Sequence, residues 1–160
     1  MYKYIHVKRI FMSFICFVIC FPSMATAWEG KVTKVINGNN LRVIDDNNEI
    51  KNVRLYGIKA PKDGIYNDKA INLIYEMVTS SGIFMMPYKR DKSQDIEVAA
   101  YTLNEDSCIN EKLILHGLAS IDKEQCRRPI CNTWKLMEKQ AKQKKLGIWS
   151  SLTRSKSTLS

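Results

Sequence analysis

The order of the elements that the sequence predicts indicates an α+β fold, a five-stranded OB-fold β-barrel with three α-helices. Three short strand patterns separated by turn residues occupy residues 30–55. One helical pattern follows, then two more strand patterns, and then two further helices. A helix between the third and the fourth of five strands suits an OB-type barrel. The 160 residues of the chain are enough for one such domain.

The first part of this domain is predicted to be a β-meander. Asn and Gly residues at 37–40, and Asp and Asn residues at 45–48, tolerate the positive φ of tight turns. On either side of these turns apolar residues alternate with polar ones such as Arg54, as in a strand with one buried face. Residues 57–64, which include Pro61, are expected to form a loop.

The remaining elements follow from the spacing of apolar residues. Helical spacing predicts helices at residues 67–79, 109–116 and 133–146, and alternation predicts strands at 83–88 and 98–103. A Gly-Ile-Trp sequence after the last helix is expected to close the domain. We expect the following apolar side chains to lie in the core: Leu55, Ile58, Ile74, Val98 and Leu113.

Residues 1–27 belong to a different physical class. Three basic residues precede an apolar run at residues 10–21, Pro22 interrupts the run, and small residues occupy positions 25 and 27. This pattern is typical of a secretory signal peptide, since about twelve apolar residues are fewer than the roughly twenty that span a bilayer. We therefore expect a signal peptide at 1–27, the barrel domain at 28–150 and a flexible tail at 151–160. The protein would be exported, periplasmic or secreted, with no transmembrane segment after cleavage.

The charge of the exported part favours anionic partners. Without the three basic residues of the signal peptide, the 25 basic residues become 22 against 16 acidic ones, a net charge of +6. A basic domain attracts nucleic acid or another polyanion. Excess lysine also serves solubility alone, so the charge does not by itself identify a ligand.

Three cysteines remain after the signal peptide, which is an odd number. An oxidising compartment permits one disulfide and one leftover thiol. Cys126 and Cys131 bracket a short turn-like loop, and we predict that they form the disulfide. Spacing leaves open a bond from Cys108 to either of them.

Four short segments resemble one known family in their order and spacing. They are the strand and turn at 30–40, the stretch Val-Arg-Leu-Tyr-Gly-Ile-Lys-Ala-Pro-Lys at 53–62, the stretch from Ile-Asn-Glu to Gly-Leu-Ala at 109–119, and Leu-Gly-Ile-Trp at 146–149. Over residues 30–149 the chain thus resembles the staphylococcal nuclease family, also called thermonuclease-like. The resemblance implies the same OB-type barrel.

The resemblance also implies a site that hydrolyses phosphodiesters with one calcium ion. Calcium prefers anionic oxygen ligands, a carboxylate serves as general base, and two arginines neutralise the charge that builds up on the phosphate. Of these groups the sequence keeps only Arg54. The residues at the positions of the two metal-binding carboxylates, the general base and the second arginine are Asn39, Lys59, Lys62 and Glu97, with Asp95 replacing Glu97 in an alternative alignment.

These replacements predict that the site has changed its chemistry. A lysine at position 59 repels calcium, and a protonated lysine at position 62 cannot accept a proton. We therefore expect a catalytically inactive module with no metal cofactor. We expect it to bind nucleic acid or another phosphate-bearing anionic ligand through a cationic former active site formed by Asn39, Arg54, Lys59 and Lys62.

Two other functions fit the sequence. The chain could be a calcium-dependent phosphodiesterase of weak or relocated activity, because the resemblance to a nuclease family leaves its status as an enzyme open. It could also be an interaction module for a protein partner in the cell envelope, using the open face of the barrel or the basic last helix. Metal-dependent cleavage would identify the phosphodiesterase, and a co-purifying envelope protein would identify the interaction module.

Overall fold

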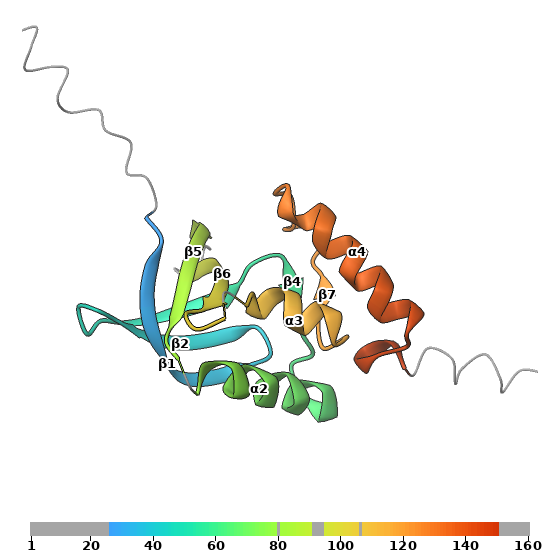
Figure 1. Ribbon diagram of the computed structural model, residues 1–160, viewed down its shortest axis with the longest axis horizontal. Coiled ribbons are helices and arrows are strands. Elements are labelled where there is room, and N and C mark those ends of the chain that lie inside the picture. The colour runs from blue at the N-terminus through green and yellow to red at the C-terminus, as the bar shows by residue number, and fades with distance from the viewer. Residues whose placement is uncertain (1–25, 80, 91–94, 106, 151–160) are drawn as a thin grey trace, which may run out of the picture.

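Five strands form a closed β-barrel in the order β1-β2-β3-β6-β5 (Figure 1). The computed structural model describes residues 26–79, 81–90, 95–105 and 107–150, so the expectations for residues 1–25 and 151–160 lie outside it. The predicted α+β barrel is confirmed. The strands are β1 (Trp28–Asn37), β2 (Asn40–Asp45), β3 (Ile50–Leu55), β5 (Ile83–Arg90) and β6 (Ile96–Thr102).

The barrel is antiparallel except at one seam. Strands β3 and β6 run parallel, with Arg54 opposite Glu97. A parallel pair needs a crossover connection, and here helix α2 and strand β5 supply it. Pairing of β1 with β5 closes the barrel, with Trp28 opposite Met85.

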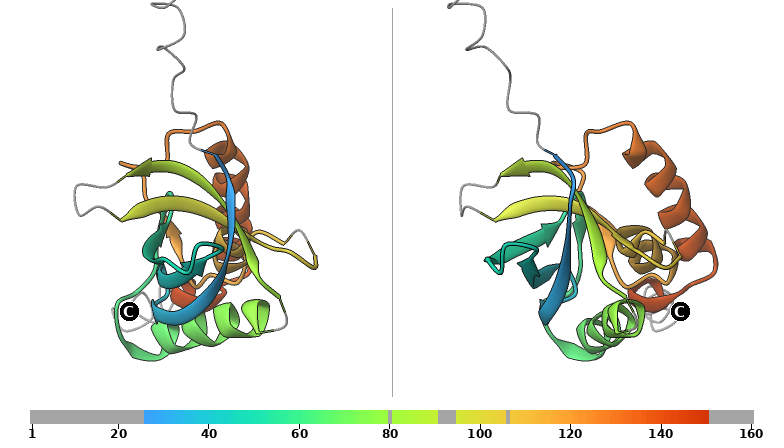
Figure 2. Two further views of the ribbon diagram at one scale, coloured as in Figure 1. Left: turned by 90° about the vertical axis from the view of Figure 1, so that its left-hand side faces the viewer. Right: turned by 60° about the vertical axis from the view of Figure 1, so that its left-hand side comes forward.

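Three helices surround the barrel. Helix α2 (Gly64–Val78) lies across one end, while α3 (Ile109–Leu115) and α4 (Ile130–Gln143) pack together on its flank (Figure 2). Helix α2 begins three residues before the predicted start. Helix α4 also begins earlier than predicted, at Ile130, so Cys131 lies in its first turn. No helix among the described residues is long and apolar enough to cross a membrane.

The sequence did not predict three short elements of the structure. Strands β4 (Ile58–Lys59) and β7 (Ser120–Ile121) pair with each other outside the barrel, and a 3-10 helix, η1, covers Gly147–Trp149. A strand of two residues has no period to detect, so its existence depends on its partner from elsewhere in the chain. The β4–β7 pair brings residues 58–59 beside residues 120–121.

The core confirms the predicted buried residues. The side chains of Leu55, Ile58, Ile74, Val98 and Leu113 are all buried. Helix α4 adds Trp134, which is fully buried and donates from Nε1 to Glu111 Oε1 at 2.9 Å.

The predicted disulfide is also present. Cys126 and Cys131 are bonded with an S–S distance of 2.07 Å. Cys108 is a buried free thiol, so the alternative bonds from Cys108 do not form.

Leu113 on α3 tests the contribution of the core. Its side chain is 0% exposed, so the Leu113→Ala variant leaves a cavity and should lower the free energy of unfolding by about 2–5 kcal/mol. Urea unfolding measures this loss. Leu136→Ala on α4, where the side chain is 64% exposed, is the control and should change stability by less than about 0.5 kcal/mol.

The buried thiol gives a second test of the fold. Burial raises the pKa of Cys108 to about 11, so the thiol is protonated near neutral pH and enclosed by the core. We expect iodoacetamide to leave Cys108 unmodified in the native protein and to modify it fully in denaturant. Mass spectrometry of the Cys108 peptide measures both fractions, and rapid labelling of the native protein would contradict the packing described here.

Candidate functional site

An open pocket of about 470 Å³ lies where the β1–β2 turn, the end of β3 and the segment after β4 meet. The structure brings the four residues predicted to bind the ligand together around this pocket. Its lining residues are Asn37, Asn39, Asn40, Arg54, Lys59, Ala60, Lys62 and Asp95.

The β1–β2 turn is held by asparagine side chains. Asn37 Oδ1 accepts hydrogen bonds from Asn39 N and from Asn40 Nδ2, each at 3.1 Å. Asn67 of α2 also holds the turn, because its Oδ1 accepts a hydrogen bond from Gly38 N at 3.1 Å. These bonds satisfy the turn backbone locally and hold Asn39 at the pocket.

Gly38 allows the turn to touch the segment that carries the lysines. A Cβ atom at position 38 would lie 2.6 Å from Ala60 Cβ and 2.9 Å from Ala70 Cβ, closer than real side chains approach. Only glycine fits this contact. The contact places Asn39 on one side of the pocket and the segment from Lys59 to Lys62 on the other.

Arg54 reaches the pocket from the end of β3, the strand that runs parallel to β6. The neighbouring Leu55 donates from its backbone N to Asn39 O at 2.8 Å, which ties the end of β3 to the β1–β2 turn. Glu97 stands opposite Arg54 in the β3–β6 ladder, but its side chain is only 2% exposed and does not line the pocket. Of the two residues that the sequence left open, Asp95 is the one that lines it.

Lys59 is held at the rim of the pocket by a buried carboxylate. Its Nζ lies 3.3 Å from Asp122 Oδ1, and the side chains are 55% and 2% exposed. Asp122 also accepts from the backbone N of Glu124 at 3.1 Å and of Gln125 at 3.3 Å, so it orders the turn after β7. Sequence spacing gave no signal for this partner, because the β4–β7 pair creates the contact.

The donor set of this pocket does not suit calcium. Calcium prefers several anionic oxygens. Asp95 is the one carboxylate among the described residues that line the pocket, whereas Arg54, Lys59 and Lys62 supply three positive charges. Nowhere among the described residues do three or more His, Cys, Asp or Glu side chains gather as a metal site would require. The arrangement is suited to holding an anion.

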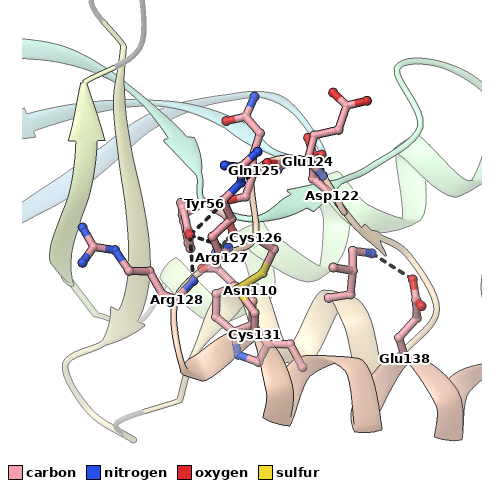
Figure 3. The surroundings of a disulfide bond; sticks show 12 residues. Tyr56, Asn110, Asp122, Glu124, Gln125, Cys126, Arg127, Arg128, Cys131 and Glu138 are labelled. Atoms are coloured by element: carbon pink, nitrogen blue, oxygen red, sulfur yellow. Dashed lines mark hydrogen bonds between the residues drawn. A yellow bond between two sulfur atoms is a disulfide. The ribbon is translucent and has the colours of Figure 1, made fainter.

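A second basic feature lies in the disulfide loop (Figure 3). Tyr56, which directly follows β3, donates from its hydroxyl to Gln125 O at 2.9 Å. The same hydroxyl accepts from the backbone N of Arg127 at 3.0 Å and of Arg128 at 3.3 Å. The sequence contains the two arginines but no pattern that places them near β3.

Comparison with known proteins supports a nuclease family. The family model described as "Staphylococcal nuclease homologue" matches residues 52–151. A protein of Escherichia coli named "Uncharacterized endonuclease" is 22% identical over 143 residues, which cover 89% of this chain and 90% of that protein. A second protein of that name, from Escherichia coli O157:H7, is 21% identical over 143 residues with the same coverage.

Asp122 provides a test of how the pocket is held. Asp122→Ala removes the acceptor of two backbone N–H groups, each bond contributing about 0.5–1.5 kcal/mol, and should lower the free energy of unfolding by about 1–3 kcal/mol. Asp122→Asn keeps an oxygen acceptor and loses only the charge facing a half-exposed lysine, so it should cost less than about 1 kcal/mol. Urea unfolding of both variants measures the difference. Equal losses would mean that the ion pair, not the turn, is the main role of Asp122.

Proposed function

Because the chain belongs to the staphylococcal nuclease homologue family, we propose that it binds the phosphodiester backbone of nucleic acid in the pocket without hydrolysing it. The charge of the pocket is the observation that carries this proposal. Among the described residues, three cations and one carboxylate line it, at the positions where the family resemblance places a calcium site, a general base and phosphate-binding arginines.

The two lysines of the pocket differ in how freely they can contact a phosphate. Lys62 is exposed and forms no ion pair within the described part of the chain, so its ammonium group is available to a phosphate. Lys59 keeps a partner in Asp122 but remains half exposed, and it therefore contributes a weaker contact. Charge-assisted hydrogen bonds to an anion contribute about 1.5–3 kcal/mol each, less where water screens them.

Hydrolysis would need groups that this pocket lacks among the residues that line it. A general base must accept a proton near neutral pH, and neither a protonated lysine nor arginine does so. Within the part of the chain that the structure describes, Asp95 is the single carboxylate there, and one carboxylate does not supply both metal ligation and base catalysis. The proposal therefore includes independence from calcium.

Export is part of the proposal as well. The Cys126–Cys131 disulfide supports it, because disulfides persist in oxidising compartments such as the periplasm. The signal-peptide pattern of the first 27 residues supports the same conclusion. A protein that meets nucleic acid there would act on extracellular or periplasmic strands.

Binding to a fluorescein-labelled single-stranded DNA oligonucleotide tests the function. We expect fluorescence anisotropy to give the same Kd in calcium and in chelator, with no cleavage in either, and a Kd that rises with salt because counterions are released on binding. The triple variant Arg54→Ala, Lys59→Ala, Lys62→Ala should weaken binding at least about tenfold, since it removes the cations that face the phosphate.

A matched variant controls for net charge. Lys135→Ala, Lys139→Ala, Lys144→Ala removes three exposed lysines from the region of α4 and should have a smaller effect than the pocket variant. Cleavage in calcium but not in chelator would refute the proposal and make the protein a calcium-dependent nuclease. Equal binding by the two triple variants would refute the pocket as the binding site.

A further inference from the structure

The disulfide closes a small loop with two arginines at its surface, residues 126–131, hereafter the dibasic loop. Arg127 and Arg128 are both exposed. Neither forms an ion pair with any described carboxylate, and the one side-chain hydrogen bond is from Arg127 Nε to the backbone oxygen of Glu124 at 2.9 Å. A guanidinium carries five N–H donors, so both side chains keep donors for a ligand.

The dibasic loop is fixed before any ligand arrives. The disulfide closes it at its ends, and the buried hydroxyl of Tyr56 holds the backbone of Arg127 and Arg128 by two hydrogen bonds (Figure 3). Helix α4 begins inside the loop at Ile130 and anchors its second half. A loop ordered in advance loses little conformational entropy on binding.

Arg128 lies on an aromatic support. Its Cζ is 5.8 Å from the ring centroid of Tyr88, which in turn lies 4.6 Å from the ring of Tyr56. Burial raises the pKa of Tyr88, so the ring stays neutral and presents its π face to the cation. A guanidinium held over a ring by its charge still has N–H donors that can bind a phosphate.

The support of the dibasic loop adjoins the pocket. Arg54 is the penultimate residue of β3, and Tyr56 is the first residue after that strand, so the two are close together in the chain. In the sheet, Arg54 is opposite Glu97, and Glu97 is opposite Lys89, the neighbour of Tyr88. Since adjacent strands are about 4.8 Å apart, the backbone at Arg54 and the backbone beside Tyr88 are about 10 Å apart.

We propose that the dibasic loop is a second phosphate-binding site, which holds two further phosphates, one at each arginine, of the same single strand of nucleic acid whose backbone enters the pocket. The inference rests on the proposed function and adds the path of the ligand. A single strand is the form that fits, because its flexible backbone can bend from the pocket over Tyr88 to the loop. Basic grooves that follow the backbone are how proteins bind single strands.

The salt dependence of binding tests this site. The probe is the fluorescein-labelled single-stranded DNA, and the variant is Arg127→Ala, Arg128→Ala in the full protein. Each phosphate contact to a single strand contributes about 0.7 to the slope of log K against log salt. The variant should therefore bind about tenfold more weakly near 0.15 M salt, with a slope reduced by about 1.4.

Two control variants make the result specific. Arg127→Lys, Arg128→Lys keeps both charges and should restore most of the slope. Lys135→Ala, Lys139→Ala removes the same charge from α4 and should leave the slope within about 0.5 of the wild-type value. If the alanine variant of the loop behaves like this α4 variant, the second site does not exist.

The failure of this inference differs from that of the proposed function. If the pocket triple variant loses binding and the loop variant binds like wild type, the pocket is supported as the binding site and the second site is refuted. Should the loop variant lose binding while the pocket variant does not, the proposed function falls and the strand binds at the loop without the pocket.

Discussion

One buried amide joins the barrel to the helices and determines where the site can form. Asn110, the second residue of α3, is fully enclosed. Its Nδ2 donates to Tyr56 O at 3.1 Å and to Val98 O at 3.4 Å, and its Oδ1 accepts from Ala100 N at 3.2 Å. A buried amide with these partners is stable only in this arrangement, because an unmade bond there costs about 1–3 kcal/mol. By fixing the backbone of Tyr56, Asn110 fixes the direction in which the chain leaves β3 toward Lys59 and the rest of the pocket.

A second constraint closes the domain from its C-terminal end. The backbones at Gly117 and Gly147 cross so closely that a Cβ on Gly147 would lie 2.1 Å from Gly117 O, and Ile148 N donates to Gly117 O at 2.8 Å. Glycine is required on both sides of such a crossing. This explains in physical terms why Gly-Leu-Ala after α3 and Gly-Ile-Trp after α4 occur together in one sequence. The crossing holds α4 against α3, and α4 in turn carries Cys131 and one end of the disulfide.

The hydrogen bonds of Asn110 and the crossing at Gly117 and Gly147 do not depend on the charge of the pocket. That charge differs from the charge of the site that the family resemblance implies. Three of the contacts that build the pocket are small or uncharged: Gly38 against Ala60, Asn67 to Gly38, and Asn39 to Leu55 through the backbone. None of them involves the side chains of Lys59 or Lys62, so replacing carboxylates by lysines leaves the scaffold in place. Fold and chemistry can therefore diverge here, which is why membership of a nuclease family does not establish hydrolysis.

The sequence by itself determined the barrel, its three helices and the predicted core residues, because alternation, helical spacing and turn residues are local signals. It favoured the Cys126–Cys131 disulfide but left a bond from Cys108 open, and the structure decided between them. The sequence also placed Asn39, Arg54, Lys59 and Lys62 at one site, although only through resemblance to a family. Tertiary structure alone decided the β4–β7 pair, the partner Asp122 for Lys59, the choice of Asp95 over Glu97 at the pocket, and the position of Arg127 and Arg128 beside Tyr56 and Tyr88. Each of these contacts joins segments far apart in the chain. Such contacts depend on how the elements pack, and no periodicity within a segment encodes them.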